Sequence, residues 1–113
     1  MAEPRRGEVW WVDLNPTRSR EPFGRRPALV VSVDLFNQGS AELIVILPIT
    51  SKSKGIPFHV PLESSEAGLN KPSFIKCEDI RSVSKDRLSR RLGKIFEGTM
   101  AAVDDRLRIL LNL

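Results

Sequence analysis

Short apolar runs separated by polar loops occupy the first three quarters of this chain. The runs are rich in Val, Ile, Leu and Trp, and Gly, Pro, Asn and Ser gather between them, a pattern typical of β-strands joined by turns. The runs predict strands at 7–14, 26–33, 42–50, 58–62 and 73–77, with further strands at 79–83 and 94–96. Both faces of the first two runs are largely apolar, so we expect these two strands to be covered on both sides.

Polar loops connect the predicted strands. The longest covers residues 15–25, which is more than a hairpin needs, and long loops on compact scaffolds are often functional. A second polar loop, at 51–57, follows the third strand. The remaining connections are predicted as turns at 34–40 and 63–72. Pro48 lies near the end of the third strand and indicates a bulge or an edge position, because proline has no backbone N–H to donate to a sheet.

The period of the pattern changes near the C-terminus. Five apolar residues fall at helical spacing and form one stripe: Met100, Val103, Leu107, Leu110 and Leu111. Thr99 is the predicted N-cap of this helix, and Asp104 and Arg108 have the spacing of a helical ion pair. Successive strands followed by one helix argue against an alternating parallel α/β sheet. We therefore predict a mainly β fold, a small bent antiparallel barrel with a C-terminal helix, as one domain over residues 1–113.

The composition indicates a globular protein. The chain has 113 residues, of which 41% are hydrophobic and 28% charged, as in an ordinary soluble domain. No apolar run approaches the roughly 20 residues of a membrane span, so we expect no membrane association. The N-terminus lacks the apolar core of a signal peptide, and the single Cys77 has no partner for an internal disulfide. We therefore expect a cytoplasmic protein.

Basic residues give the chain a formal net charge of +4, which is modest evidence for a polyanionic partner. They crowd into the first quarter of the chain and into residues 85–94. Either cluster is as typical of a solvated face as of a nucleic-acid surface. Arg26 is distinctive because Pro27 follows it. A proline at a strand entrance holds the preceding residue extended at the edge of a rigid scaffold, where a guanidinium is well placed to bind a phosphate.

The residues that most common catalytic mechanisms require are missing. One His and one Cys, without clustered carboxylates, do not make a zinc site, and the chain has neither a phosphate-binding glycine loop nor a nucleophile elbow. His59 and Cys77 lie in apolar runs and are predicted to be structural. Arg, Glu, Thr and Lys at loop–strand junctions remain, and such groups suffice to cleave RNA, whose 2′-hydroxyl is its own nucleophile. On these grounds alone they are also consistent with ordinary loop positions.

Four segments resemble, in order, the signatures of the MazF/PemK (Kid-type) family of toxins from type II toxin–antitoxin systems. They read RGEVWWVDLNPTR at 6–18, GRRPALVVS at 24–32, LPITS at 47–51, and CEDIRSV at 77–83 followed by KDRL at 85–88. The resemblance implies a bent SH3-like barrel that forms a homodimer. It implies a metal-independent, sequence-specific endoribonuclease, without a cofactor, that leaves a 2′,3′-cyclic phosphate and a 5′-hydroxyl. It also implies an antitoxin of the MazE type, whose extended acidic segment lies across the RNA groove.

The same resemblance implies three catalytic residues, Arg26, Thr50 and Glu21. In this interpretation Arg26 stabilises developing charge, Thr50 donates a hydrogen bond to a phosphate oxygen, and Glu21 orients or deprotonates the 2′-hydroxyl. The candidate RNA-binding residues are Arg20, Phe23, Arg25, Ser51, Lys52, Lys54, Asp79 and Arg81. The chain departs from the family in two places. Phe23 follows the loop acid, where it either stacks on a base or pins the loop, and Asp79 stands where a glutamine is common.

Two functions of other classes remain open. The same barrel occurs in CcdB-type toxins, which inhibit DNA gyrase through protein contact, and a small nucleic-acid-binding barrel would need no catalytic residues. Arg26 before Pro27, together with Thr50, favours the nuclease. The chain ends in LLNL, without the tryptophan that gyrase poisons of that type carry at the end of their terminal helix. We therefore expect RNA cleavage.

Overall fold

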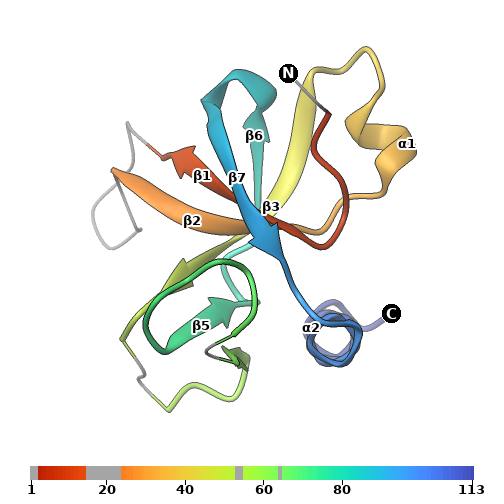
Figure 1. Cartoon of the computed structure of the whole chain (residues 1–113). Coiled ribbons are helices and arrows are strands. Elements are labelled where there is room, and N and C mark those ends of the chain that lie inside the picture. The colour runs from red at the N-terminus through yellow and green to blue at the C-terminus, as the bar shows by residue number, and fades with distance from the viewer. Residues whose placement is uncertain (1–2, 15–23, 53–54, 64) are drawn as a thin grey trace.

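Strands form most of this protein, and a helix ends it (Figure 1). The computed structural model describes residues 3–14, 24–52, 55–63 and 65–113. The strands in this part of the chain are β1 (Glu8–Asp13), β2 (Arg25–Val30), β3 (Leu43–Thr50), β4 (His59–Leu62), β5 (Ser73–Lys76), β6 (Arg81–Ser84) and β7 (Leu88–Lys94). The helices are α1 (Asp34–Asn37), the 3₁₀ turn η1 (Lys85–Arg87) and α2 (Glu97–Leu111). The predicted mainly β fold with a C-terminal helix is confirmed.

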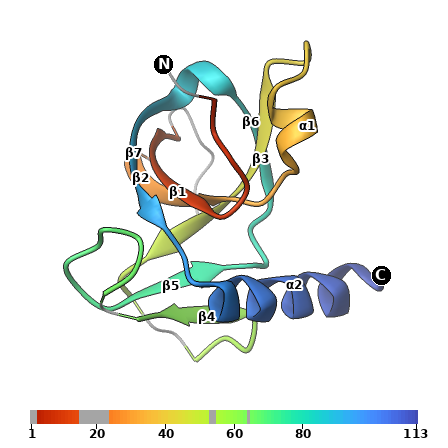
Figure 2. The ribbon, with the colours of Figure 1, turned by 45° about the vertical axis from the view of Figure 1, so that its right-hand side comes forward.

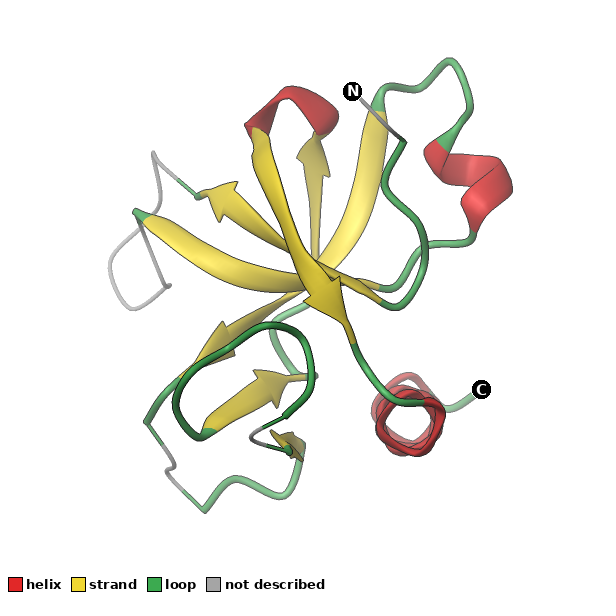
Figure 3. Cartoon of the chain, viewed as in Figure 1, coloured by secondary structure: helices red, strands yellow, loops and turns green. Residues whose placement is uncertain are grey.

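The strands form one curled antiparallel sheet, as Figure 3 shows. Their order is β4-β5-β3-β2-β1-β7, and β6 also pairs with β3. Strand pairing in the described residues does not close this path, so the bent sheet is an open form of the predicted barrel. β3 is its centre, because it pairs with β6, β2 and β5 along successive parts of its length.

β3 transfers from one neighbour to another near its C-terminal end. It pairs with β2 up to Pro48, which lies opposite Ala28. From Ile49 onward it pairs with β5 instead. Pro48 was predicted to mark a bulge or an edge, and it lies inside the strand at this transfer point. A residue without an N–H suits the place where one hydrogen-bonding neighbour ends and the next begins. The ends of β2 and β3 therefore form a fork.

Two apolar clusters lie on opposite faces of the central strands. Val9 and Leu29 belong to the first cluster, and their chain neighbours Trp10 and Ala28 belong to the second. Such alternation along one strand requires both of its faces to be buried, so the prediction that β1 and β2 are covered on both sides is confirmed. Val103 of α2 joins the first cluster and fixes the helix to the sheet. Figure 2 shows α2 alongside β4, with its C-terminal half extending past the strands.

β7 is the strand that the hydrophobic pattern misplaced. A strand was predicted at 94–96, and the structure has it at Leu88–Lys94, where the sequence reads LSRRLGK. Three of its charged side chains, Arg90, Arg91 and Lys94, are exposed. In the described sheet β7 pairs with β1 alone, and an edge strand with outward-facing charges resists pairing with other chains. These charges conceal the strand from a search for apolar runs.

The predicted cap of α2 is also wrong. The helix begins at Glu97, with Phe96 in the N-cap position. Thr99 lies within the first turn, and its hydroxyl donates to a carboxylate oxygen of Glu66 at 3.0 Å. A side chain from a distant loop thus satisfies the helix start, which no local capping pattern reveals.

Three smaller differences concern local pairing and boundaries. Asp104 forms an ion pair with Arg6, not the predicted helical pair with Arg108. The predicted turn at 34–40 contains the single-turn helix α1. β2 ends at Val30, earlier than the predicted residue 33. Among the described residues, no helix has both the length and the apolar character needed to cross a membrane.

Candidate active site

A cavity of about 480 Å³ opens at the fork between β2 and β3. Residues of the first three strands, with one residue before β2 and one after β3, line one part of it: Trp11, Gly24, Arg25, Arg26, Pro27, Ile49, Thr50 and Ser51. The segment between β4 and β5, together with the start of β5, lines the rest: Leu69, Asn70, Lys71 and Ser73. Four of the residues predicted from the sequence therefore meet in one cavity.

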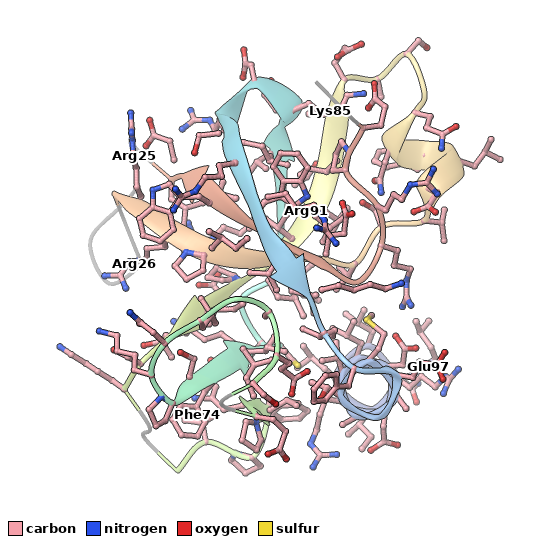
Figure 4. The ribbon with its side chains drawn as sticks, in the orientation of Figure 1. Arg25, Arg26, Phe74, Lys85, Arg91 and Glu97 are labelled. Carbon is pink, nitrogen blue, oxygen red and sulfur yellow. The ribbon has the colours of Figure 1, made fainter. Side chains whose placement is uncertain are left out.

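Strand register explains how Arg26 and Thr50 come together. β2 and β3 are antiparallel, with Ala28 opposite Pro48. Continuing this register, Arg26 lies two residues before Ala28 in β2, and Thr50 lies two residues after Pro48 in β3. At Thr50, β3 already pairs with β5. The cavity occupies the space between these diverging strand ends. Figure 4 shows Arg25 and Arg26 at the outer end of β2, with side chains that point in different directions.

The Thr50 hydroxyl is oriented by its own loop. Its oxygen accepts a hydrogen bond from the backbone N–H of Lys52 at 3.1 Å. This short turn orders the start of the loop that follows β3. Because the oxygen is used as an acceptor here, the hydroxyl hydrogen is directed elsewhere and suits donation to an anion in the cavity.

Positive charge dominates the cavity lining. Arg25, Arg26 and Lys71 bring three cations to it from two separate segments, and no Asp or Glu occurs among the described residues of the lining. Arg25 and Lys71 are exposed, and Arg26 is half-buried. Cations gathered in a partly closed space attract polyanions, and planar guanidinium groups match the geometry of phosphate.

Asp79 and Arg81 form an ion pair that does not line the cavity. Arg81 donates to both carboxylate oxygens of Asp79, at 3.0 Å for each contact. Lys76 approaches the same carboxylate at 3.6 Å. The predicted RNA contacts of these two residues therefore require a surface other than the described lining of the cavity. Their mutual bond takes up part of the hydrogen-bonding capacity that each has for RNA.

Of the other predicted residues, the structure describes Lys52 and leaves four outside its described ranges. Lys52 is exposed and touches the site only through its backbone bond to Thr50. The remaining four, Arg20, Glu21, Phe23 and Lys54, lie outside the described residues. The roles predicted for them remain predictions.

Sequence reasoning missed Trp11 and the 69–73 wall. Trp11 received no role in the sequence analysis, and it lines the cavity while Trp10 lies in the core. Lys71 carried a signal that went unused: it precedes Pro72 and a strand, as Arg26 precedes Pro27 within β2. Asn70 had no comparable signal, because it lies in a turn rich in polar residues.

The side chains of His59 and Cys77, predicted to be structural, are both buried. The His59 ring is buried, and its Nε2 lies 2.9 Å from Oε2 of Glu78. Burial raises the pKa of the Cys77 thiol to about 12; the Glu78 charge adds to this rise, and Arg106 opposes it. A thiol with such a pKa stays protonated at neutral pH and is a poor nucleophile. Within the described ranges, no three His, Cys, Asp or Glu side chains are grouped so that they could hold a metal ion.

Comparison with known sequences places nearly the whole chain in one family. Residues 5–111 match the model of the PemK-like, MazF-like toxin of type II toxin–antitoxin systems. Endoribonuclease MazF9 of Mycobacterium tuberculosis (strain ATCC 25618 / H37Rv) is 39% identical over 114 residues, which cover 96% of this chain and 97% of that protein.

Solved structures share the fold. MazF (Form-I) from Deinococcus radiodurans superposes with a TM-score of 0.88 at 31% identity, over 100% of both chains. A mycobacterial endoribonuclease in complex with its cognate antitoxin has a TM-score of 0.79 at 26% identity, covering 100% of this chain and 97% of that one.

Proposed function

Because the chain belongs to the PemK-like, MazF-like toxin family of type II toxin–antitoxin systems, we propose that it is a sequence-specific endoribonuclease that cleaves single-stranded RNA. The observation that carries the proposal is the cavity at the fork, where Arg26 and Thr50 line a space whose described residues include three cations and no carboxylate. Such a space suits a phosphodiester. An RNA substrate makes the cytoplasm the proposed site of action.

The proposed reaction uses the RNA's own 2′-hydroxyl. The 2′-oxygen bonds to the adjacent phosphorus while Glu21 orients the hydroxyl or accepts its proton. The bond from phosphorus to the 5′-oxygen breaks, and that oxygen takes up a proton. The products are a 2′,3′-cyclic phosphate and a 5′-hydroxyl, and no step requires a metal ion or a cofactor.

Arg26 and Thr50 act on the charge that develops during this step. A guanidinium hardly releases its proton, so Arg26 is proposed to stabilise the phosphorane and not to act as an acid. The Thr50 hydroxyl, whose oxygen already accepts the Lys52 N–H, donates to a non-bridging phosphate oxygen. Both groups sit on strand ends, which hold them more precisely than a loop does.

A homodimer is the second part of the proposal. The C-terminal end of α2 exposes four large apolar side chains: Ile109, Leu110, Leu111 and Leu113. Clustered apolar side chains of this size mark interaction surfaces. A second copy of the chain is the proposed partner for this end. Light scattering after gel filtration tests it, and Leu111→Glu is expected to yield monomers if the surface is correct.

An acidic antitoxin is the third part. The cations of the cavity are suited to an extended acidic segment as well as to RNA, and a structural relative is known in complex with its cognate antitoxin. An antitoxin of the MazE type that occupied this cavity would inhibit by excluding the substrate. Competition between a labelled RNA and the antitoxin's acidic segment measures this directly.

RNA cleavage in EDTA tests the proposed enzyme. Purified protein is incubated with a long single-stranded RNA, and new 5′ ends are mapped by primer extension. Wild-type protein is expected to make discrete cuts that share a motif, and Arg26→Ala is expected to lose them. Arg5→Ala is the matched control, because Arg5 is exposed and its ion pair with Asp34, at 3.8 Å, lies outside the cavity.

An absence of cuts from folded, dimeric wild-type protein on several RNAs would contradict the proposal. A gyrase supercoiling assay and an RNA filter-binding assay would then distinguish a gyrase inhibitor from a binding protein without activity.

A further inference from the structure

The loop between β4 and β5 forms a wall of the cavity to which the family resemblance gave no role. Leu69, Asn70 and Lys71 of this loop line the cavity, as does Ser73 at the start of β5. A loop contributes more to binding when its position is already defined, because ordering a mobile loop costs free energy on binding. The contacts of the loop with α2 and with β7 show whether its position is fixed.

A buried carboxylate ties the loop to α2. Glu66 is 1% exposed, and its two oxygens accept three hydrogen bonds. The donors are the backbone N–H of Glu63 at 2.7 Å, the backbone N–H of Phe96 at 2.9 Å and the Thr99 hydroxyl at 3.0 Å. The positive end of the α2 dipole further stabilises the carboxylate. The loop is therefore anchored at Glu66 to the start of the helix.

Backbone packing against β7 holds the next part of the loop. Gly68 has a φ of +68°, and a Cβ at this position would lie 2.3 Å from the carbonyl oxygen of Leu92. A Cβ on Gly93 would lie 2.6 Å from the carbonyl carbon of Ala67. Only glycine permits so close an approach on both sides. Leu69, Asn70 and Lys71 follow directly from this fixed point.

The backbone of Lys71 is held by its neighbours, and its side chain pairs with no acid in the part of the chain that the structure describes. Its carbonyl oxygen accepts a hydrogen bond from the Ser73 hydroxyl at 3.1 Å, and Pro72 favours an extended backbone at Lys71. Among the described residues the Lys71 ammonium has no ion-pair partner, whereas Lys76 pairs with Asp79 and Lys85 pairs with Glu3 and Glu42. An exposed, unpaired ammonium at the lining of a cationic cavity is placed to bind an anion.

We propose that Lys71 is an RNA-binding residue that holds a phosphate neighbouring the scissile one, and that Glu66 is the residue that positions it. The inference rests on the proposed function, since the ligand is the same RNA. Arg26 and Thr50 bind the reacting phosphate from the strand ends, and Lys71 binds the chain from the loop wall. A lysine acts as a point charge without a fixed fork, which suits a backbone contact that carries no sequence information.

Binding and turnover of Lys71→Ala provide the test. The binding probe is an RNA oligonucleotide that contains a mapped cut site and a 2′-O-methyl group at the scissile nucleotide, which blocks cleavage. Lys71→Ala is expected to raise Kd and KM about tenfold and to leave kcat within about twofold, because a phosphate contact contributes equally to ground-state and transition-state binding. The slope of log Kd against log salt is expected to decrease by about 0.7, the value for one phosphate on a single strand.

Three further variants separate this role from general effects. Lys71→Arg keeps the charge and is expected to bind like wild type. Lys94→Ala removes an exposed lysine outside the cavity lining and is expected to change neither Kd nor the salt slope. Glu66→Gln removes the anchor's charge and is expected to raise Kd while the salt slope stays that of wild type, because the ammonium is present but poorly positioned.

The outcomes distinguish this inference from the proposed function. If wild type cleaves RNA but Lys71→Ala matches Lys94→Ala in Kd and salt slope, the role of Lys71 is wrong and the nuclease stands. A loss of kcat at unchanged KM would also overturn it. If wild type neither cleaves nor binds the RNA, the proposed function itself fails.

Discussion

Two basic regions look alike in the sequence and differ in their electrostatic surroundings in the fold. Arg25, Arg26 and Lys71 line the cavity, whose described residues include no carboxylate. In the 85–94 region, Lys85 pairs with Glu3 at 2.7 Å and Arg91 pairs with Glu8 at 2.7 Å. Among the described residues, acids therefore pair with two of the cations in the 85–94 region, and none of them lines the cavity. A count of basic residues does not distinguish the two regions, whereas the placement of the described acids does.

Arg26→Ala gives the largest expected effect and tests the role of the cavity, the first of the two regions. Removal of one preorganised group that stabilises transition-state charge costs about 10²- to 10³-fold in kcat. Cleavage rates under single-turnover conditions, with thermal unfolding to verify the fold, provide the measurement. A rate within tenfold of wild type would show that the charge at residue 26 does not act on the reacting phosphate.

Asn70→Asp would place an acid beside a cation of the cavity, as acids are placed beside Lys85 and Arg91 in the 85–94 region. A carboxylate beside Lys71 offers it a partner and repels phosphate, so RNA affinity is expected to fall about tenfold. Fluorescence anisotropy with the uncleavable RNA measures the change. Gln38→Glu adds the same charge at an exposed position in α1's cap and serves as the control. Equal affinities for the two variants would indicate that RNA does not approach the loop wall.

Arg91→Ala tests whether the 85–94 region, where Arg91 pairs with Glu8, takes no part in RNA cleavage. Its Nε donates to Glu8 Oε2, but half of the Arg91 side chain is exposed, which limits the contribution of the pair. Glu8 keeps its hydrogen bonds from the backbone of Arg5 and from Trp10 Nε1. We expect a loss of about 1 kcal/mol in unfolding free energy by urea denaturation, with cleavage within about twofold of wild type. A hundredfold loss of cleavage would place the RNA on β7.

Cys77 gives the smallest effect, confined to alkaline solution. Its thiol pKa rises from 9.0 to about 12 on folding, chiefly through burial. Above pH 9 the unfolded thiol releases its proton while the folded one keeps it, so stability is full below pH 9 and falls as the pH rises toward 12. Between about pH 8 and about pH 10, wild type is expected to lose about 1 kcal/mol more unfolding free energy than Cys77→Ala. Identical pH dependence in the two proteins would contradict the raised pKa.

Local signals in the sequence predicted only part of the strand side of the cavity. The Arg26–Pro27 junction is a property of adjacent residues and singled out Arg26, whereas Thr50 was predicted from the resemblance of LPITS at 47–51 to a family signature. The start of α2 was not predictable, because Glu66 reaches it from a distant loop. β7 was concealed by the charges of an edge strand, and the Lys71 wall depends on contacts of Gly68 and Gly93 that only the folded backbone makes.

The hydrogen bonds of Glu66 also determine when, during synthesis of the chain, the cavity wall becomes fixed. Phe96 and Thr99 supply two of the three donors to this carboxylate, and both follow Lys71 by more than twenty positions in the chain. A nascent polypeptide that still holds residues 96–99 inside the ribosome lacks this anchor. Its cavity wall gains this anchor only after residues 96–99 have left the ribosome. A partly synthesised chain is therefore without the fixed wall that carries Lys71.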